Sequence, residues 1–172
     1  MRGTIILGIM ALCVSTASFG YIVDGSRINR PSMLSYAKSK LQNRGVIEQA
    51  AGGPAYLKVP ESYIKELHKQ IQIPGYELPA ISRISIFDET EAKNISVLQE
   101  LGQTVQFKPL GFYTIVVDDQ EYFMLAVEAP QLSQIRQKYG LTEQLENQSF
   151  NITIGVRKMQ AHNELESQGE KS

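Results

Sequence analysis

The stretch Phe150-Asn151-Ile152-Thr153-Ile154-Gly155 decides how the fold of this 172-residue chain is interpreted. Its polar and apolar residues alternate, which is typical of a β-strand with one face in a core. Because successive side chains of a strand point to opposite faces, Asn151 and Thr153 are expected together on one face and the isoleucines on the other. The sequence therefore predicts a strand over 148–156 that presents an amide beside a hydroxyl.

A second tetrad of the same kind, Arg83-Ile84-Ser85-Ile86, lies in the predicted strand 80–87. Its polar residues are again expected on one face. If the two strands lie side by side, they line one groove with two hydroxyls, an amide and a guanidinium. These groups can donate hydrogen bonds to the oxygens of a phosphate. None of these groups exchanges protons near neutral pH. The predicted ligand-binding residues are Arg83, Ser85, Asn151 and Thr153, and no catalytic residue is predicted.

The segments around the tetrads predict an α+β domain with mainly antiparallel sheets and outer helices. The Asp118-Asp119-Gln120 stretch predicts a hairpin loop. Asp88 and Glu91 predict a capping box at the start of a helix that ends at Gly102. Each tetrad follows a helix in a weakly duplicated order, and duplicated halves often place a site on their pseudo-symmetry axis. The predicted strands span 56–59, 80–87, 105–110, 112–117, 121–127 and 148–156, and the predicted helices span 33–44, 61–71, 88–102 and 130–139.

Four sections of the chain are expected. Residues 1–20 have the positive start, short apolar core and small-residue exit of a cleavable signal peptide, and the apolar run is too short to span a bilayer. A polar lead with one helix over 21–53 precedes the main domain at 54–157, and 158–172 is expected to be a disordered tail. The product is therefore expected to be secreted or periplasmic in a bacterium, with no membrane contact after signal cleavage.

Composition excludes several classes of function. The formal net charge of -1 gives no basic field for bulk nucleic-acid binding. The sequence has no Gly-rich phosphate loop, no metal-spaced His/Cys cluster and no Gly-x-Ser-x-Gly turn, so neither a metal nor a cofactor is predicted. The only histidines, His68 and His162, lie outside the tetrads, and His68 is expected to pack or to form a hydrogen bond at the edge of its helix.

The chain resembles the two-histidine (2H) phosphoesterase superfamily, which includes RNA 2',3'-cyclic phosphodiesterases. Members carry two copies of His-x-Ser/Thr-x on central strands of a bilobal α+β fold. They often have Tyr-Gly-Leu followed by Phe-His-Ile-Thr-Ile-Gly, and here Tyr139-Gly140-Leu141 precedes the 150–155 stretch. The resemblance covers about 56–157 and implies that the two tetrads stand at the positions of the family's catalytic motifs.

The chain departs from the family pattern at the residues that perform the chemistry. In members, one histidine is the general base and the other is the general acid, whereas Arg83 and Asn151 occupy those positions here. The resemblance implies that Ser85 and Thr153 keep the phosphate-binding hydroxyls. It therefore implies a catalytically degenerate domain that binds a phosphorylated or anionic ligand such as a nucleotide or an RNA end. Arg157 is a further candidate cation, expected on the same face as Thr153.

Two alternatives remain open from the sequence. One is an active phosphodiesterase that has moved its acid and base, with His68 or an acidic residue as the substitute. The other is a secreted interaction module that binds a protein partner through the groove or through residues 21–44. Whether the protein is an enzyme is not decided by the sequence.

Overall fold

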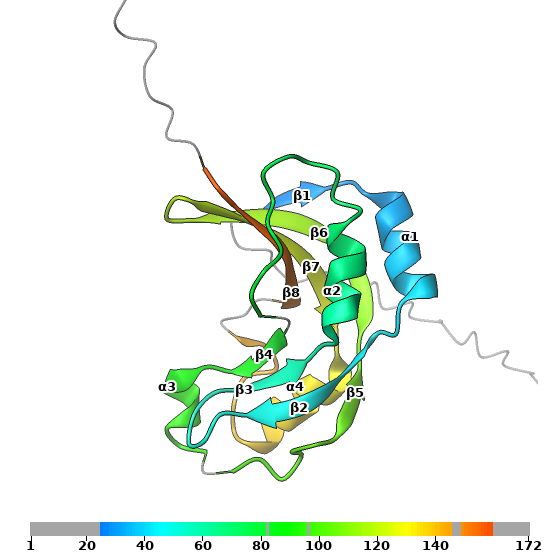
Figure 1. Cartoon of the computed structure of the whole chain (residues 1–172). Coiled ribbons are helices and arrows are strands. Elements are labelled where there is room, and N and C mark those ends of the chain that lie inside the picture. Colours follow the sequence, from blue (N-terminus) through cyan, green and yellow to red (C-terminus); the bar gives the residue numbers. More distant parts are fainter. Residues whose placement is uncertain (1–24, 82, 96, 146–148, 160–172) are drawn as a thin grey trace, which may run out of the picture.

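A computed structural model describes residues 25–81, 83–95, 97–145 and 149–159 (Figure 1). The predicted signal peptide and residues 160–172 of the predicted tail lie outside the described residues. The described chain forms two four-stranded sheets in which all strand pairs are antiparallel. The predicted α+β class with mainly antiparallel sheets is therefore confirmed.

Sheet A is the upper sheet of Figure 1 and sheet B the lower one. The strand order in sheet A is β1-β6-β7-β8, and in sheet B it is β4-β3-β2-β5. Sheet A consists of β1 (Ser26–Ile28), β6 (Lys108–Val117), β7 (Gln120–Glu128) and β8 (Phe150–Lys158). Sheet B consists of β2 (Arg44–Gln49), β3 (Ala55–Lys58), β4 (Arg83–Phe87) and β5 (Thr104–Gln106).

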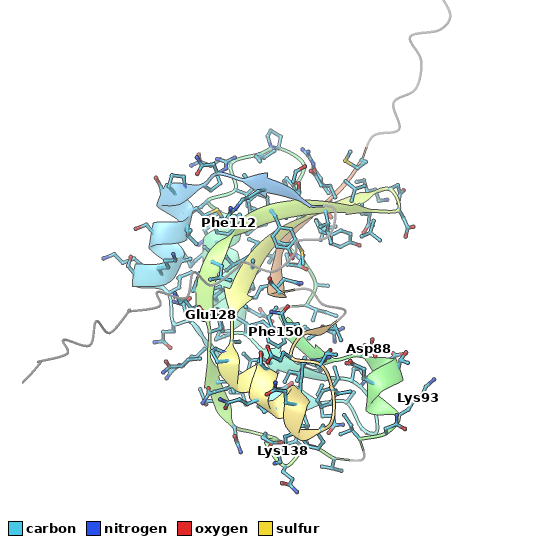
Figure 2. The ribbon with its side chains drawn as sticks, turned by 180° about the vertical axis from the view of Figure 1, so that it is seen from behind. Asp88, Lys93, Phe112, Glu128, Lys138 and Phe150 are labelled. Atoms are coloured by element: carbon cyan, nitrogen blue, oxygen red, sulfur yellow. The ribbon has the colours of Figure 1, made fainter. Side chains whose placement is uncertain are left out.

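The helices pack on the outer faces of the sheets and close one continuous hydrophobic core. α1 (Pro31–Lys40) packs on β6, and α2 (Glu61–His68) packs on β8 of sheet A. α4 (Pro130–Lys138) packs on β4 and β5 of sheet B, beside the short α3 (Glu89–Ala92). Figure 2 shows this second group from behind, with Lys138 at the end of α4 and Asp88 and Lys93 at the two ends of α3. Of the described helices, none has the length and apolarity needed to cross a bilayer.

The two halves of the domain repeat one unit. β2, β3, α2 and β4 form a hairpin, a helix and a strand, and β6, β7, α4 and β8 repeat that order. In each half, a short edge strand (β5 or β1) pairs with the first strand of the hairpin. β4 and β8 are therefore equivalent strands, each at an edge of its own sheet, and they lie next to one another (Figure 1).

The predicted boundary near Pro54 does not separate structural units. Residues 51–54 form the connection between the paired strands β2 and β3, and the predicted helix 33–44 ends at Lys40. Residues 44–49 form a strand that pairs with β3 and β5, with Gly45 and Ile47 buried and Arg44 and Val46 exposed. The lead at 21–53 thus contributes β1 and β2 to the same two sheets as the rest of the domain.

The predicted helix 88–102 is much shorter than its pattern suggested. Asp88 caps α3 as predicted, because its Oδ1 accepts from the backbone N–H groups of Thr90 and Glu91 at 2.7 and 2.8 Å. The helix nevertheless ends at Ala92. Further along, the backbone N–H of Leu98 donates to the Gln49 side chain at 3.0 Å, so a tertiary contact takes the place of a helical hydrogen bond.

Candidate functional site

β4 presents the first tetrad as the alternation predicted. Arg83 and Ser85 are exposed on one face, and Ile84 and Ile86 are fully buried on the other. The two isoleucines belong to the core that α4 covers. The polar pair therefore lies on the face of β4 opposite to this core.

β8 presents the second tetrad in the same way. Asn151 and Thr153 are half-buried, whereas Ile152 and Ile154 are fully buried in the same core as the β4 isoleucines. The Thr153 hydroxyl lies 3.3 Å from the sulfur of Met124. The Asn151 amide donates to the Ser149 carbonyl at 3.3 Å. These contacts hold both polar side chains on the non-core face of sheet A.

The structure brings the two tetrad strands together but divides the four predicted ligand-binding residues. All four lie on the non-core faces of adjacent edge strands. Arg83 also lines an open pocket of about 580 Å³, and Ser85, Asn151 and Thr153 are not among its lining residues. Arg83 is therefore the best-placed of the four to meet a ligand that enters this pocket.

The side chains that neighbour the two tetrads on the non-core faces of sheets B and A differ in chemistry. On sheet B, Tyr56 pairs with Ser85 and Lys58 pairs with Arg83 in the strand register, so aromatic and charged side chains surround the first tetrad. On sheet A, the corresponding neighbours are the small cluster of Tyr113, Met124 and Ala126, which is apolar apart from one phenol. Burial raises the pKa of Tyr113 to about 12, although a hydrogen bond with Asn151 acts in the opposite direction.

Arg83 differs from Lys58, its neighbour on sheet B, because among the described residues it contacts an aromatic ring and not a carboxylate. Its guanidinium carbon lies 5.2 Å from the centroid of the Tyr56 ring, which is a cation–π contact. Lys58 is paired with Glu48 at 3.1 Å, and this hydrogen bond raises the pKa of the lysine. The Tyr56 hydroxyl also donates to Glu48, at 3.3 Å. Among the residues that the structure describes, none places a carboxylate within 4.0 Å of Arg83.

Arg157 does not lie on the face of β8 that carries Asn151 and Thr153, contrary to the prediction. A bulge at Ile154 shifts the register of β8, so that Thr153 pairs with Met124 and Gly155 with Phe123. The shift places Arg157 on the opposite face from Thr153. There it forms an ion pair with Glu121 at 2.5 Å, and its guanidinium lies 4.8 Å from the Tyr76 ring centroid.

The described histidine does not face the tetrads. Nε2 of His68 forms a hydrogen bond with the carbonyl of Tyr76 at 3.2 Å, as expected for a packed helix-edge residue. Its helix, α2, covers the core side of β8, whereas Asn151 and Thr153 lie on the other side. His162 lies outside the described residues, and no group of three potential metal ligands occurs within the described part of the chain.

Arg136 is a buried residue near the site that the sequence interpretation missed. Its side chain is 0% exposed, and it donates to the Ile86 carbonyl on β4 and to both oxygens of Glu91, at 2.8 and 2.7 Å. It also donates to the carbonyls of Thr142 and Gln144 in the connection that leads to β8, at 2.7 and 3.1 Å. A signal existed, because position 136 falls on the buried stripe of α4 four residues after Leu132. Arg136 thus ties β4 to the segment preceding β8.

Chemically, this arrangement can bind an anion but offers no acid–base pair. A guanidinium and hydroxyls donate charge-assisted hydrogen bonds to phosphate oxygens. Neither a guanidinium nor an amide can accept and return a proton near neutral pH. The tetrad positions therefore lack the groups that general acid–base catalysis needs.

Comparison with known proteins agrees with this architecture. The model of the family described as "Swiss Army Knife, 2H phosphoesterase domain" (2H-SAK) matches residues 55–162, which include both tetrads. Neither the curated proteins nor the solved structures gave a match. The family match covers more than half of the chain, and the duplicated units with β4 and β8 side by side are consistent with it. The chain therefore belongs to the Swiss Army Knife family of 2H phosphoesterase domains.

Proposed function

We propose that this protein is an exported, catalytically degenerate 2H phosphoesterase domain that binds a phosphorylated or anionic ligand, such as a nucleotide or an RNA end. The ligand is bound by Arg83, Ser85, Asn151 and Thr153. The observation that carries the proposal is the state of Arg83, a cation at the pocket with no carboxylate within 4.0 Å among the described residues. An anionic group is the natural partner of such a guanidinium.

Binding is favoured over catalysis because the two positions that hold the catalytic histidines in the family are occupied by an arginine and an asparagine, side-chain types that do not serve as general acids or bases near neutral pH. General acid or base catalysis contributes typically about 10²- to 10⁴-fold each. A domain that lacks both groups keeps little of that rate enhancement. The two hydroxyls and the arginine retain the ability to hold phosphate oxygens, and Arg83 adds the option of a bidentate contact.

A relocated catalytic histidine receives no support from the geometry. His68, the last residue of α2, forms a hydrogen bond with the Tyr76 carbonyl, and α2 packs on the core side of β8. A proton donor or acceptor must come within hydrogen-bond reach of the reacting atoms. Reaching the Thr153 face from that position would require the helix to leave the core.

Export is the second part of the proposal. It is supported by the positive start, short apolar core and small-residue exit of residues 1–20. The expected destination is the periplasm or the medium of a bacterium. The N-terminal sequence of the protein recovered from a secreting host tests this, and an N-terminus between Ala17 and Tyr21 is the expected result.

The ligand proposal is tested by titration calorimetry with a nucleoside monophosphate. Arg83→Gln should weaken binding about 10- to 100-fold, because a hydrogen bond to a charged group is worth about 1.5–3 kcal/mol. Arg44→Gln is a matched control, since Arg44 is an exposed arginine on the same face of sheet B and is bonded to Gln42. Equal affinities in the natural protein and Arg83→Gln, or no binding by either, would contradict the proposal.

A further inference from the structure

A run of four apolar residues, Leu78-Pro79-Ala80-Ile81, lies at the surface and ends two positions before β4 begins. Leu78 is 43% exposed and Ile81 is 56% exposed. Single exposed apolar side chains are common, but consecutive exposed ones are avoided in soluble domains unless they have a function. The run therefore calls for a ligand or a partner that covers it.

The run lies between two fixed points. Glu77, just before it, forms two backbone hydrogen bonds with Val156 of β8, at 2.8 and 3.0 Å. Arg83, two positions after Ile81, is the first residue of β4. The run thus follows a residue that is bonded to β8 and precedes β4, the other tetrad strand.

All four residues of the run line the pocket that contains Arg83. Val59 and Ile64, each 1% exposed, add apolar surface to the same pocket. The pocket also holds two lysines, but both are already paired: Lys58 with Glu48 at 3.1 Å and Lys65 with Glu61 at 3.0 Å. Among the described residues that line the pocket, Arg83 is therefore the cation without such a pair, and it shares the pocket with the apolar residues 78–81.

We propose that this pocket binds an amphiphilic anion, with a single phosphate group at Arg83 and an alkyl chain against residues 78–81. The inference rests on the proposed function, because it uses Arg83 as the anion-binding group. It goes further by naming the chemistry of the rest of the ligand. A volume of about 580 Å³ lies within the ordinary range of small-molecule sites.

The test is a calorimetric titration of the full mature chain with butyl, hexyl and octyl phosphate, each kept below its micellar concentration, and with inorganic phosphate. Full burial of a methylene group strengthens binding about fourfold. Because the run is partly exposed, we expect about twofold to fourfold per methylene, so octyl phosphate should bind at least tenfold more tightly than butyl phosphate.

Variants locate the alkyl chain. The double variant Leu78→Ser with Ile81→Ser should lose the dependence on chain length while keeping its affinity for inorganic phosphate. Both positions are exposed, so the fold should tolerate the change. Val116→Ser is the matched control, because Val116 is also 56% exposed but lies on β6, away from the pocket. Arg83→Gln should weaken all the phosphates by a similar factor.

The outcomes separate this inference from the proposed function. Affinities that depend on Arg83 but not on alkyl chain length would overturn the amphiphile proposal and agree with the anion site of the proposed function. The apolar run would then be assigned to the binding of a protein partner. A chain-length dependence that survives Leu78→Ser with Ile81→Ser would also overturn it. Absence of binding by every phosphate would overturn the proposed function and this inference together.

Discussion

Replacement of Arg136 by methionine is the perturbation whose effect on stability the structure predicts most directly. The guanidinium is fully buried, and it is the cationic partner of Glu91, whose side chain is 22% exposed. Methionine retains the length and apolar stem of the side chain but no donor. The substitution leaves the Glu91 carboxylate and the buried Ile86 carbonyl without the hydrogen bonds that Arg136 donates to them.

The magnitude follows from those lost partners. Removal of one member of a buried ion pair costs about 3–5 kcal/mol. Water can partly solvate Glu91, which reduces this figure, whereas the unpaired Ile86 carbonyl adds about 1 kcal/mol. We therefore expect Arg136→Met to lower the free energy of unfolding by about 3 kcal/mol, which corresponds to a drop in Tm of about 10 °C for a domain of this size.

Urea unfolding followed by far-ultraviolet circular dichroism measures this loss. Arg44→Met serves as the control, because Arg44 is exposed and bonds only Gln42 among the described side chains, and its loss should stay within about 0.5 kcal/mol. Adding Glu91→Leu to Arg136→Met should restore part of the stability, since no buried charge then lacks a partner. A loss below about 1 kcal/mol in Arg136→Met would show that the buried ion pair with Glu91 contributes little to stability.

Two further predictions concern packing and pH. Gly45→Ala should lower the free energy of unfolding by about 1–3 kcal/mol, because the new Cβ would lie 2.5 Å from the backbone oxygen of Lys58. Gly111→Ala is the control and should change stability by less than about 0.5 kcal/mol, because no atom of the described residues beyond its chain neighbours lies within 4 Å of its Cβ position. Equal losses of Tm in the two variants would contradict this explanation. Burial acts to raise the pKa of Glu100, but hydrogen bonds, that from Lys138 foremost, outweigh it and leave the pKa below its usual 4.5. The stability that Glu100 contributes is therefore present above pH 4.5 and lost as the pH falls through the lowered pKa, so urea midpoints measured from pH 6 to 3 should fall more steeply in the natural protein than in Glu100→Gln. Parallel pH profiles of the two proteins would contradict this.

The features that sequence alone predicted are those fixed by local pattern. The alternation in both tetrads placed Arg83 and Thr153 on non-core faces because a strand has a period of two residues. The hairpin between β6 and β7 was predicted from its loop residues, and Asp118 does adopt a φ of 54° there. Asp118 and Asp119 form the loop alone, since Val117 pairs with Gln120.

The features that were missed depend on contacts between distant segments. No local pattern reveals the bulge at Ile154, which turns Arg157 to the other face of β8. Helix α3 ends early because the chain beyond Ala92 is held by contacts with β2, such as that between Leu98 and Gln49. Similarly, β2 shows its alternation over only a few residues, and pairing with β3 and β5 makes it a strand.

In the function proposed above, the protein retains a phosphoesterase site for binding but has lost its chemistry. Turnover of 2',3'-cyclic nucleotides and linear phosphodiesters tests it most directly, with the natural protein measured beside the variant that carries both Arg83→His and Asn151→His. We expect no hydrolysis by the natural protein above the rate in buffer, and measurable hydrolysis by the double variant. Hydrolysis by the natural protein at enzymatic rates would contradict it.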